Sequence, residues 1–162
     1  MKTAIVYYSM SGNTAQTAEK IAAQLGADLI RIAPVNAYPD SGMRKFIWGG
    51  KSALMGETPQ LEPYTFQAEA YDRVIFGSPV WASCFAPPLR TFIKEQEAGL
   101  RGKRFAAFVC QSGSGADKAL KKLQLALVAH LEAVLALNDP KDKPSPVNEK
   151  RIADFCKLLS AE

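Results

Sequence analysis

The chain has 162 residues, of which 48% are hydrophobic, and its formal net charge is +4. This length and apolar fraction suffice for a sizeable core, so we expect residues 1–162 to form a single domain. The positive charge is mild, and no basic stripe interleaved with aromatic residues accompanies it, so nucleic acid is excluded as an expected partner. No run of about 18 apolar residues occurs, and we therefore expect no membrane span.

The chain is strand-like from Thr3 and lacks the apolar core and small-residue cleavage site of a signal peptide, so we expect a cytoplasmic protein. Cys84, Cys110 and Cys156 are odd in number and widely spaced, which argues against a disulfide framework or a zinc site. The single histidine, His130, closes an apolar helical pattern and is assigned no role. We predict neither metal ligands nor catalytic residues.

The first predicted unit is a strand, a polar loop, a helix and a second strand. Residues 3–8 are β-branched and aromatic without a polar break, which is typical of a strand buried on both faces, and residues 27–32 form a similar run. Between them apolar residues recur at helical spacing as far as Gly26, a residue type favoured just past a helix end. An irregular region at 33–71 follows.

The irregular region contains one predicted helix, at 41–56, between pairs of prolines. Gly49 and Gly50 lie inside it and weaken this prediction, because glycine is unfavourable within a helix.

The rest of the chain repeats the alternation. Strands are predicted in the run 72–80, which is strand-like until Pro79, and at 105–110 and 132–137. Helices are predicted at 88–97, 116–131 and 148–160. The helix at 116–131 carries Leu120, Leu123, Leu127 and Leu131 on one face. Because neighbouring parallel strands need a crossover, and the crossovers here are helices, the pattern predicts an α/β, doubly wound three-layer sandwich around a five-stranded parallel sheet.

Three polar segments follow predicted strands: SMSGNT at 9–14, SPVWASC at 78–84 and QSGSG at 111–115. Ligands of open parallel sheets bind beyond the carboxyl ends of the strands, where the strand order reverses. We therefore expect the three segments to build one site.

The segment at 9–14 combines hydroxyl groups, an amide and the N–H groups of a helix start, which together favour an anion. It has no lysine or arginine and does not match the glycine spacing of a dinucleotide loop. A terminal phosphomonoester fits such a segment better than a polyphosphate. The alternative is an ordinary helix cap.

The other two segments indicate a planar ligand more weakly. Trp81 comes just after a strand end, where its planar ring would suit a planar ligand. The alternative is that Trp81 packs at the rim of the core. Gly113 and Gly115 allow close approach of the backbone to a ligand, but glycine-rich turns between strand and helix are common without one.

The stretches YYSMSGNT, FGSPVWASCFAPPLRTFI and CQSGSG resemble loops of the flavodoxin family, short-chain type, and the resemblance spans nearly the whole chain. It implies bound FMN, electron transfer and the flavodoxin-like strand order 2-1-3-4-5. It also implies three sets of cofactor-binding residues. The phosphate would be held by Ser9, Met10, Ser11, Gly12, Asn13 and Thr14. The flavin ring would be lined by the segment Ser78, Pro79, Val80, Trp81 and Ala82, with Trp81 stacking on it. The opposite side of the ring or the ribityl chain would be approached by Ser112, Gly113, Ser114 and Gly115.

Two other functions are rejected on chemistry. Cys84 and Arg90 have the spacing of cysteine-dependent phosphatases, but Pro87 and Pro88 lack the N–H groups that such a loop must supply. A phosphoacceptor signalling domain needs acidic residues at the ends of the first and third strands, where this chain has Tyr-Ser and Gly-Ser pairs.

We predict an FMN-binding protein, monomeric or homodimeric, that carries electrons to a redox partner protein. The alternative is an FMN-dependent NAD(P)H:quinone oxidoreductase, in which the insert at 33–71, with Phe46 and Trp48, covers the nicotinamide and the quinone. A third possibility is a binding module that keeps the fold without flavin. The best-known flavodoxins are strongly acidic and this chain is mildly basic, which leaves the redox partner open.

Overall fold

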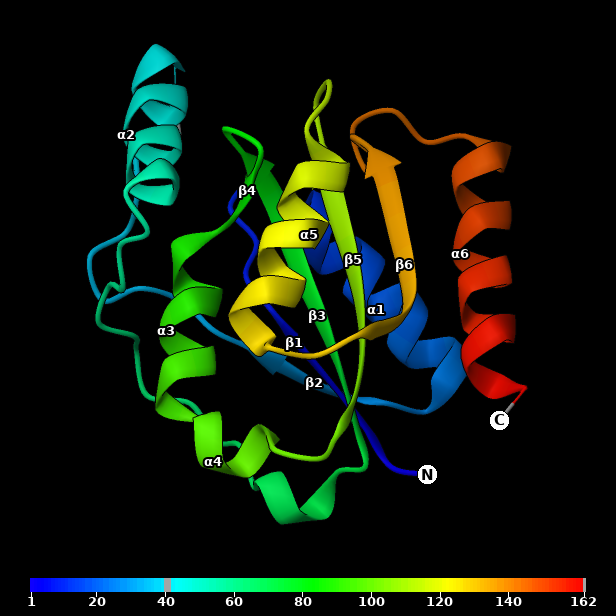
Figure 1. The fold of residues 1–162 in the computed structure, drawn as a ribbon. Helices are drawn as coiled ribbons and strands as arrows, with labels where there is room; N and C mark the ends of the chain where they lie inside the picture. The colour runs from blue at the N-terminus through cyan, green and yellow to red at the C-terminus, as the bar shows by residue number, and fades with distance from the viewer. Residues whose placement is uncertain (40–41, 162) are drawn as a thin grey trace.

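The structure, a computed structural model, describes residues 1–39 and 42–161, without the side chains of residues 42–46. Its sheet contains five parallel strands in the order β2-β1-β3-β5-β6 (Figure 1). Their bounds are β1 Thr3–Tyr7, β2 Asp28–Arg31, β3 Arg73–Trp81, β5 Arg104–Gln111 and β6 Leu131–Asn138. A short strand, β4 (Cys84–Phe85), pairs antiparallel with β3 alone. With β4 set aside, the order is the predicted 2-1-3-4-5, and the fold class is confirmed.

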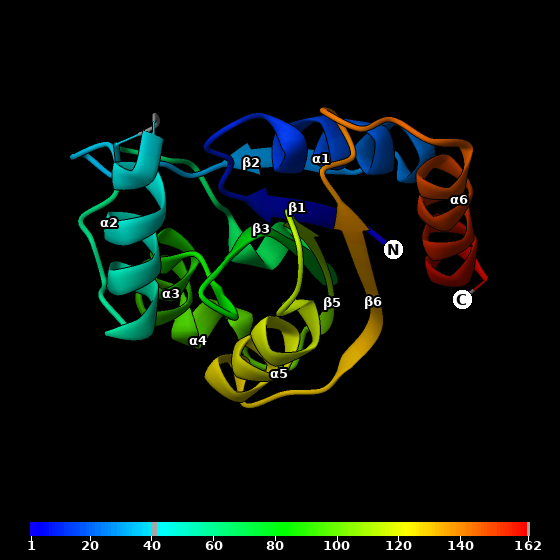
Figure 2. The ribbon, with the colours of Figure 1, turned by 90° about the horizontal axis from the view of Figure 1, so that it is seen from above.

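Helices cover both faces of the sheet and give three layers (Figure 2). One face carries α1 (Asn13–Leu25) and α6 (Pro146–Ser160), and the other carries α3 (Pro87–Glu95) and α5 (Ala116–Leu127). The remaining helices are α2 (Gly42–Leu54), the short α4 (Glu97–Leu100) and a 3-10 turn, η1 (Ala68–Ala70). None of the helices in the described ranges is long and apolar enough to cross a membrane.

Rows of residues in register across the central strands form the core. Ile5 and Ile75 lie side by side beneath α1 and α6, and Val6 and Phe76 lie side by side on the opposite face. All four are fully buried. Because successive side chains of a strand point to opposite faces, an uninterrupted apolar run is what a strand between two helical layers requires.

The main departure from the prediction is a β-hairpin after β3. The sequence predicts a polar loop from Ser78 to Cys84, but β3 continues through Pro79 to Trp81 and turns back into β4. Ala82 and Ser83 form the turn with φ of 50° and 59°. Such left-handed turns usually contain asparagine and glycine, so the sequence carried no hairpin signal here.

The helix predicted at 116–131 ends four residues early, at Leu127. Val128 adopts a left-handed conformation, with φ of 51°, and its N–H bonds back to the last helical turn. Leu131 therefore opens β6 and does not extend the helical row, and His130 lies exposed in the connection.

Candidate functional site

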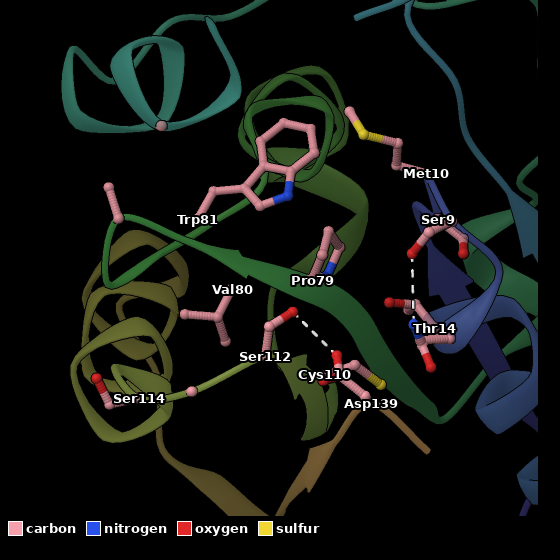
Figure 3. Close-up of a pocket in the computed structure, with 15 residues that line it drawn as sticks. Ser9, Met10, Thr14, Pro79, Val80, Trp81, Cys110, Ser112, Ser114 and Asp139 are labelled. Carbon is pink, nitrogen blue, oxygen red and sulfur yellow. Dashed lines mark hydrogen bonds between the residues drawn. The ribbon is translucent and has the colours of Figure 1, made fainter. Parts of the chain in front are cut away.

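A cavity of about 340 Å³ lies at the carboxyl edge of the sheet, among the segments that follow β1, β3 and β5 (Figure 3). β1 is flanked by β2 and β3, so the cavity is at the point where the strand order reverses. The structure brings all three predicted segments together there. The predicted residues in its wall are Ser9, Met10, Ser11, Asn13, Thr14, Pro79, Val80, Trp81, Ala82, Ser112, Gly113 and Ser114.

The first segment forms the turn that leads from β1 into α1. Ser9 Oγ accepts hydrogen bonds from the backbone N–H groups of Gly12, at 3.2 Å, and Ala15, at 3.1 Å, and so fixes the turn. Gly12 has φ of 98°, which glycine adopts without strain. Asn13 and Thr14 open α1, and N–H groups of a first turn have no acceptor within the helix. These N–H groups and the buried Thr14 hydroxyl suit a phosphate.

The Asn13 side chain is already engaged elsewhere. Its Oδ1 accepts from the backbone N–H of Lys141 at 2.8 Å, and its Nδ2 donates to Asp142 Oδ2 at 2.9 Å. It is only 7% exposed. The amide that the sequence assigns to a phosphate therefore anchors the loop between β6 and α6, while the Asn13 backbone remains at the helix start.

Trp81 belongs to an aromatic cluster at the rim. Its indole meets Tyr8 edge-on at a centroid distance of 5.6 Å and Tyr38 at 5.1 Å. A Cβ at Gly49 of α2 would lie 3.1 Å from Trp81 Cε3, so a larger residue there would require the indole or α2 to move by a few tenths of an ångström. Trp81 is thus both a packed rim residue and a wall of the cavity. Burial raises the pKa of Tyr8 well above its usual value, so this neighbour stays a neutral phenol.

Three predicted residues shape the site without lining the cavity: Gly12, Ser78 and Gly115. Ser78 is fully buried, and its Oγ accepts from the N–H of Ala86 at 2.8 Å and donates to the carbonyl of Pro79 at 2.7 Å. Gly115 has φ of 102°, and a Cβ there would lie 2.7 Å from Ser83 Oγ. Gly115 thus lets the third segment approach the β3–β4 hairpin.

Sequence reasoning missed three lining residues, Gly50, Cys110 and Asp139. Asp139 Oδ1 accepts from Ser112 Oγ at 2.9 Å (Figure 3), and its Oδ2 lies 3.4 Å from Lys143 Nζ. Asp139 directly follows β6, so the rule that ligands bind beyond the carboxyl ends of strands would have pointed to it.

Cys110 in the cavity wall is neutral, and Cys84 in the β3–β4 hairpin contacts a lysine. Burial raises the pKa of Cys110 to about 11, so its thiol stays protonated near neutral pH. Cys84 is buried, and Lys122 Nζ lies 2.9 Å from its sulfur. Arg90 lies over the Phe85 ring, 4.7 Å from its centroid. Within residues 1–39 and 42–161, no group of three or more histidine, cysteine or acidic residues is placed to hold a metal.

Comparison with solved structures shows the same fold. A candidate flavoprotein from Bacteroides eggerthii is 24% identical, with 99% of each chain covered and a TM-score of 0.77. A flavoprotein from Lactobacillus acidophilus, solved in complex with FMN, is 21% identical, with 87% of this chain and 95% of that chain covered and a TM-score of 0.72. Oxidised flavodoxin 2 from Bacillus cereus is 19% identical, with 99% of each chain covered and a TM-score of 0.61.

No curated protein matches this chain in sequence. A family model does: the flavodoxin model matches residues 2–134. That range includes β1, β3 and β5 and all three segments of the cavity wall. The chain therefore belongs to the flavodoxin family.

Proposed function

We propose that the protein binds FMN in this cavity and carries electrons between redox partners. One observation carries the proposal: a single cavity joins the start of α1, with its backbone N–H and hydroxyl donors, to an apolar, aromatic wall. Figure 3 shows Ser9 and Thr14 on one side of it and Val80 and Trp81 on the other. FMN has a terminal phosphate at one end and a planar ring at the other, so this wall matches both ends.

Different residues would bind the phosphate and the ring of FMN. The N–H groups of Asn13 and Thr14 would hold the phosphate, and Val80 and Trp81 would flank the ring. Bound FMN would supply a ring that accepts and releases electrons. Ala82 and residues 112–114 are exposed, which would leave the edge of the ring open to a partner protein. An open edge is what an electron carrier needs.

A second candidate, the NAD(P)H:quinone oxidoreductase, is favoured by one feature of α2. This helix lies against Trp81. It carries three large apolar side chains that are 53% to 64% exposed, Ile47, Trp48 and Leu54, and Met55, just after the helix, is 66% exposed. An apolar cover of this kind suits a nicotinamide or quinone stacked on the ring. The side chain of Phe46, which belongs to the predicted cover, lies outside the described part of the structure.

Flavin titration tests the proposal. The purified protein should bind FMN tightly and riboflavin much more weakly, because only FMN has the phosphate. If it binds neither flavin, the proposal is wrong and the flavin-free binding module is favoured. With FMN bound, steady-state oxidation of NADH or NADPH with a quinone separates the two candidates: turnover identifies a reductase, and its absence leaves the carrier.

A further inference from the structure

The phosphate-binding segment at 9–14 contains no basic residue, yet a lysine from a distant part of the chain lies over it. Lys141, in the loop between β6 and α6, donates from Nζ to the backbone carbonyl of Ser11 at 3.1 Å. Its Cδ, Cε and Nζ would lie 3.1 to 3.3 Å from a Cβ at Gly12. The absence of a side chain at Gly12 therefore makes room for the lysine at the start of α1.

The Asn13 side chain holds the loop that carries Lys141 against the start of α1. Its Oδ1 accepts from the backbone N–H of Lys141 at 2.8 Å, and its Nδ2 donates to Asp142 Oδ2 at 2.9 Å. The same residue thus opens α1 and anchors the loop that carries Lys141. A nearly buried amide with both ends engaged holds this loop in one place.

The charges around Lys141 leave its ammonium group weakly compensated. Its polar contact at hydrogen-bond distance is a neutral carbonyl, and Asp142 Oδ1 is 3.8 Å away. Asp142 accepts from Asn13, while Asp139 accepts from Ser112 and pairs with Lys143. A phosphate dianion at the helix start would offer Lys141 a charge-assisted bond, which is stronger than a bond to a neutral carbonyl.

We propose that Lys141 pairs with the phosphate of the bound flavin nucleotide and that Asn13 is the residue that positions it. This inference rests on the proposed function, because it concerns the same cavity and the same ligand. It adds that discrimination between FMN and riboflavin depends on a cation supplied from outside the phosphate loop.

Titration of FMN and riboflavin by flavin fluorescence tests the role of Lys141. Lys141→Gln should raise the Kd for FMN about tenfold, equivalent to about 1.4 kcal/mol, and leave the Kd for riboflavin unchanged. Raising the salt concentration should weaken FMN binding more in the wild type than in this variant, because salt screens an ion pair. Lys150→Gln, the same change on α6, where Lys150 is exposed and pairs with Asp154, is the matched control and should leave FMN binding within twofold.

Several results would overturn the inference. If Lys141→Gln binds FMN like the wild type, Lys141 is not the counter-ion, although the proposed function stands. Equal losses for both flavins would show that the variant disturbs the cavity as a whole. Equal effects of Lys150→Gln and Lys141→Gln would indicate a diffuse potential without a specific pair. A wild-type protein that binds neither flavin would defeat the proposed function and this inference together.

The positioning role of Asn13 is tested by a double-mutant cycle. Asn13→Ala should lower the preference for FMN over riboflavin as Lys141→Gln does, and the two changes should not add, because the second removes a contact that the first has already released. If the two losses in FMN affinity simply add, Asn13 does not act through Lys141, and this part of the inference fails.

Discussion

The hydroxyl of Thr14 offers a sharp test of the phosphate assignment. Thr14 lies in the first turn of α1, lines the cavity and is 1% exposed. Thr14→Val removes the hydroxyl while keeping the shape of the side chain. A hydrogen bond to a charged group contributes about 1.5–3 kcal/mol, so the Kd for FMN should rise roughly 10- to 150-fold. At so buried a site, water cannot readily replace the lost hydroxyl of Thr14.

Ser11→Ala provides the comparison. Ser11 also lines the cavity, but its side chain is exposed, so water can take its place, and we expect a loss of about 1 kcal/mol or less. Both variants are titrated with FMN and riboflavin, and thermal denaturation checks that they are folded. The reasoning is refuted if Thr14→Val leaves FMN affinity unchanged, if riboflavin affinity falls equally, or if the exposed Ser11 proves the more important hydroxyl.

Three further predictions concern the ring site, the cavity charge and the fold. Flavin binding should quench the fluorescence of Trp81, and the quenching should remain in Trp48→Phe but disappear in Trp81→Phe. If the quenching disappears in Trp48→Phe instead, Trp81 only packs at the rim of the core. Asp139→Asn should strengthen FMN binding severalfold in low salt, because it removes a negative charge from the cavity wall. Asparagine tolerates the backbone φ of 38° at this position, and unchanged or weaker FMN binding in the same titration would contradict the prediction. Glu132→Ala should lower the free energy of unfolding by about 3–5 kcal/mol, because it removes the carboxylate 2.5 Å from the Nε of Arg73, whose side chain is 4% exposed. If chemical denaturation gives a loss below about 1 kcal/mol, this ion pair contributes little to stability.

The amino-acid sequence was sufficient for the architecture and for the segments that build the site. Apolar runs such as 3–8 and 105–110 are buried on both faces, and helices separate them, so a parallel sheet between two helical layers was the consistent solution. The carboxyl ends of parallel strands lie at one edge of the sheet, and ligands of open parallel sheets bind there. The three polar segments that follow these strands were therefore expected to meet at that edge. These inferences depend on local periodicity and chain order, which a sequence displays directly.

What the sequence could not supply were contacts between residues far apart in the chain. Nothing near Asn13 indicates that its amide binds the backbone of Lys141, and nothing near Gly49 indicates that it lies on Trp81. The hairpin at Ala82 and Ser83 was also missed, because its turn residues lack the usual preference for positive φ. Each of these features depends on which side chains packing brings within a few ångströms, and that proximity exists only once the sheet and its helices have assembled.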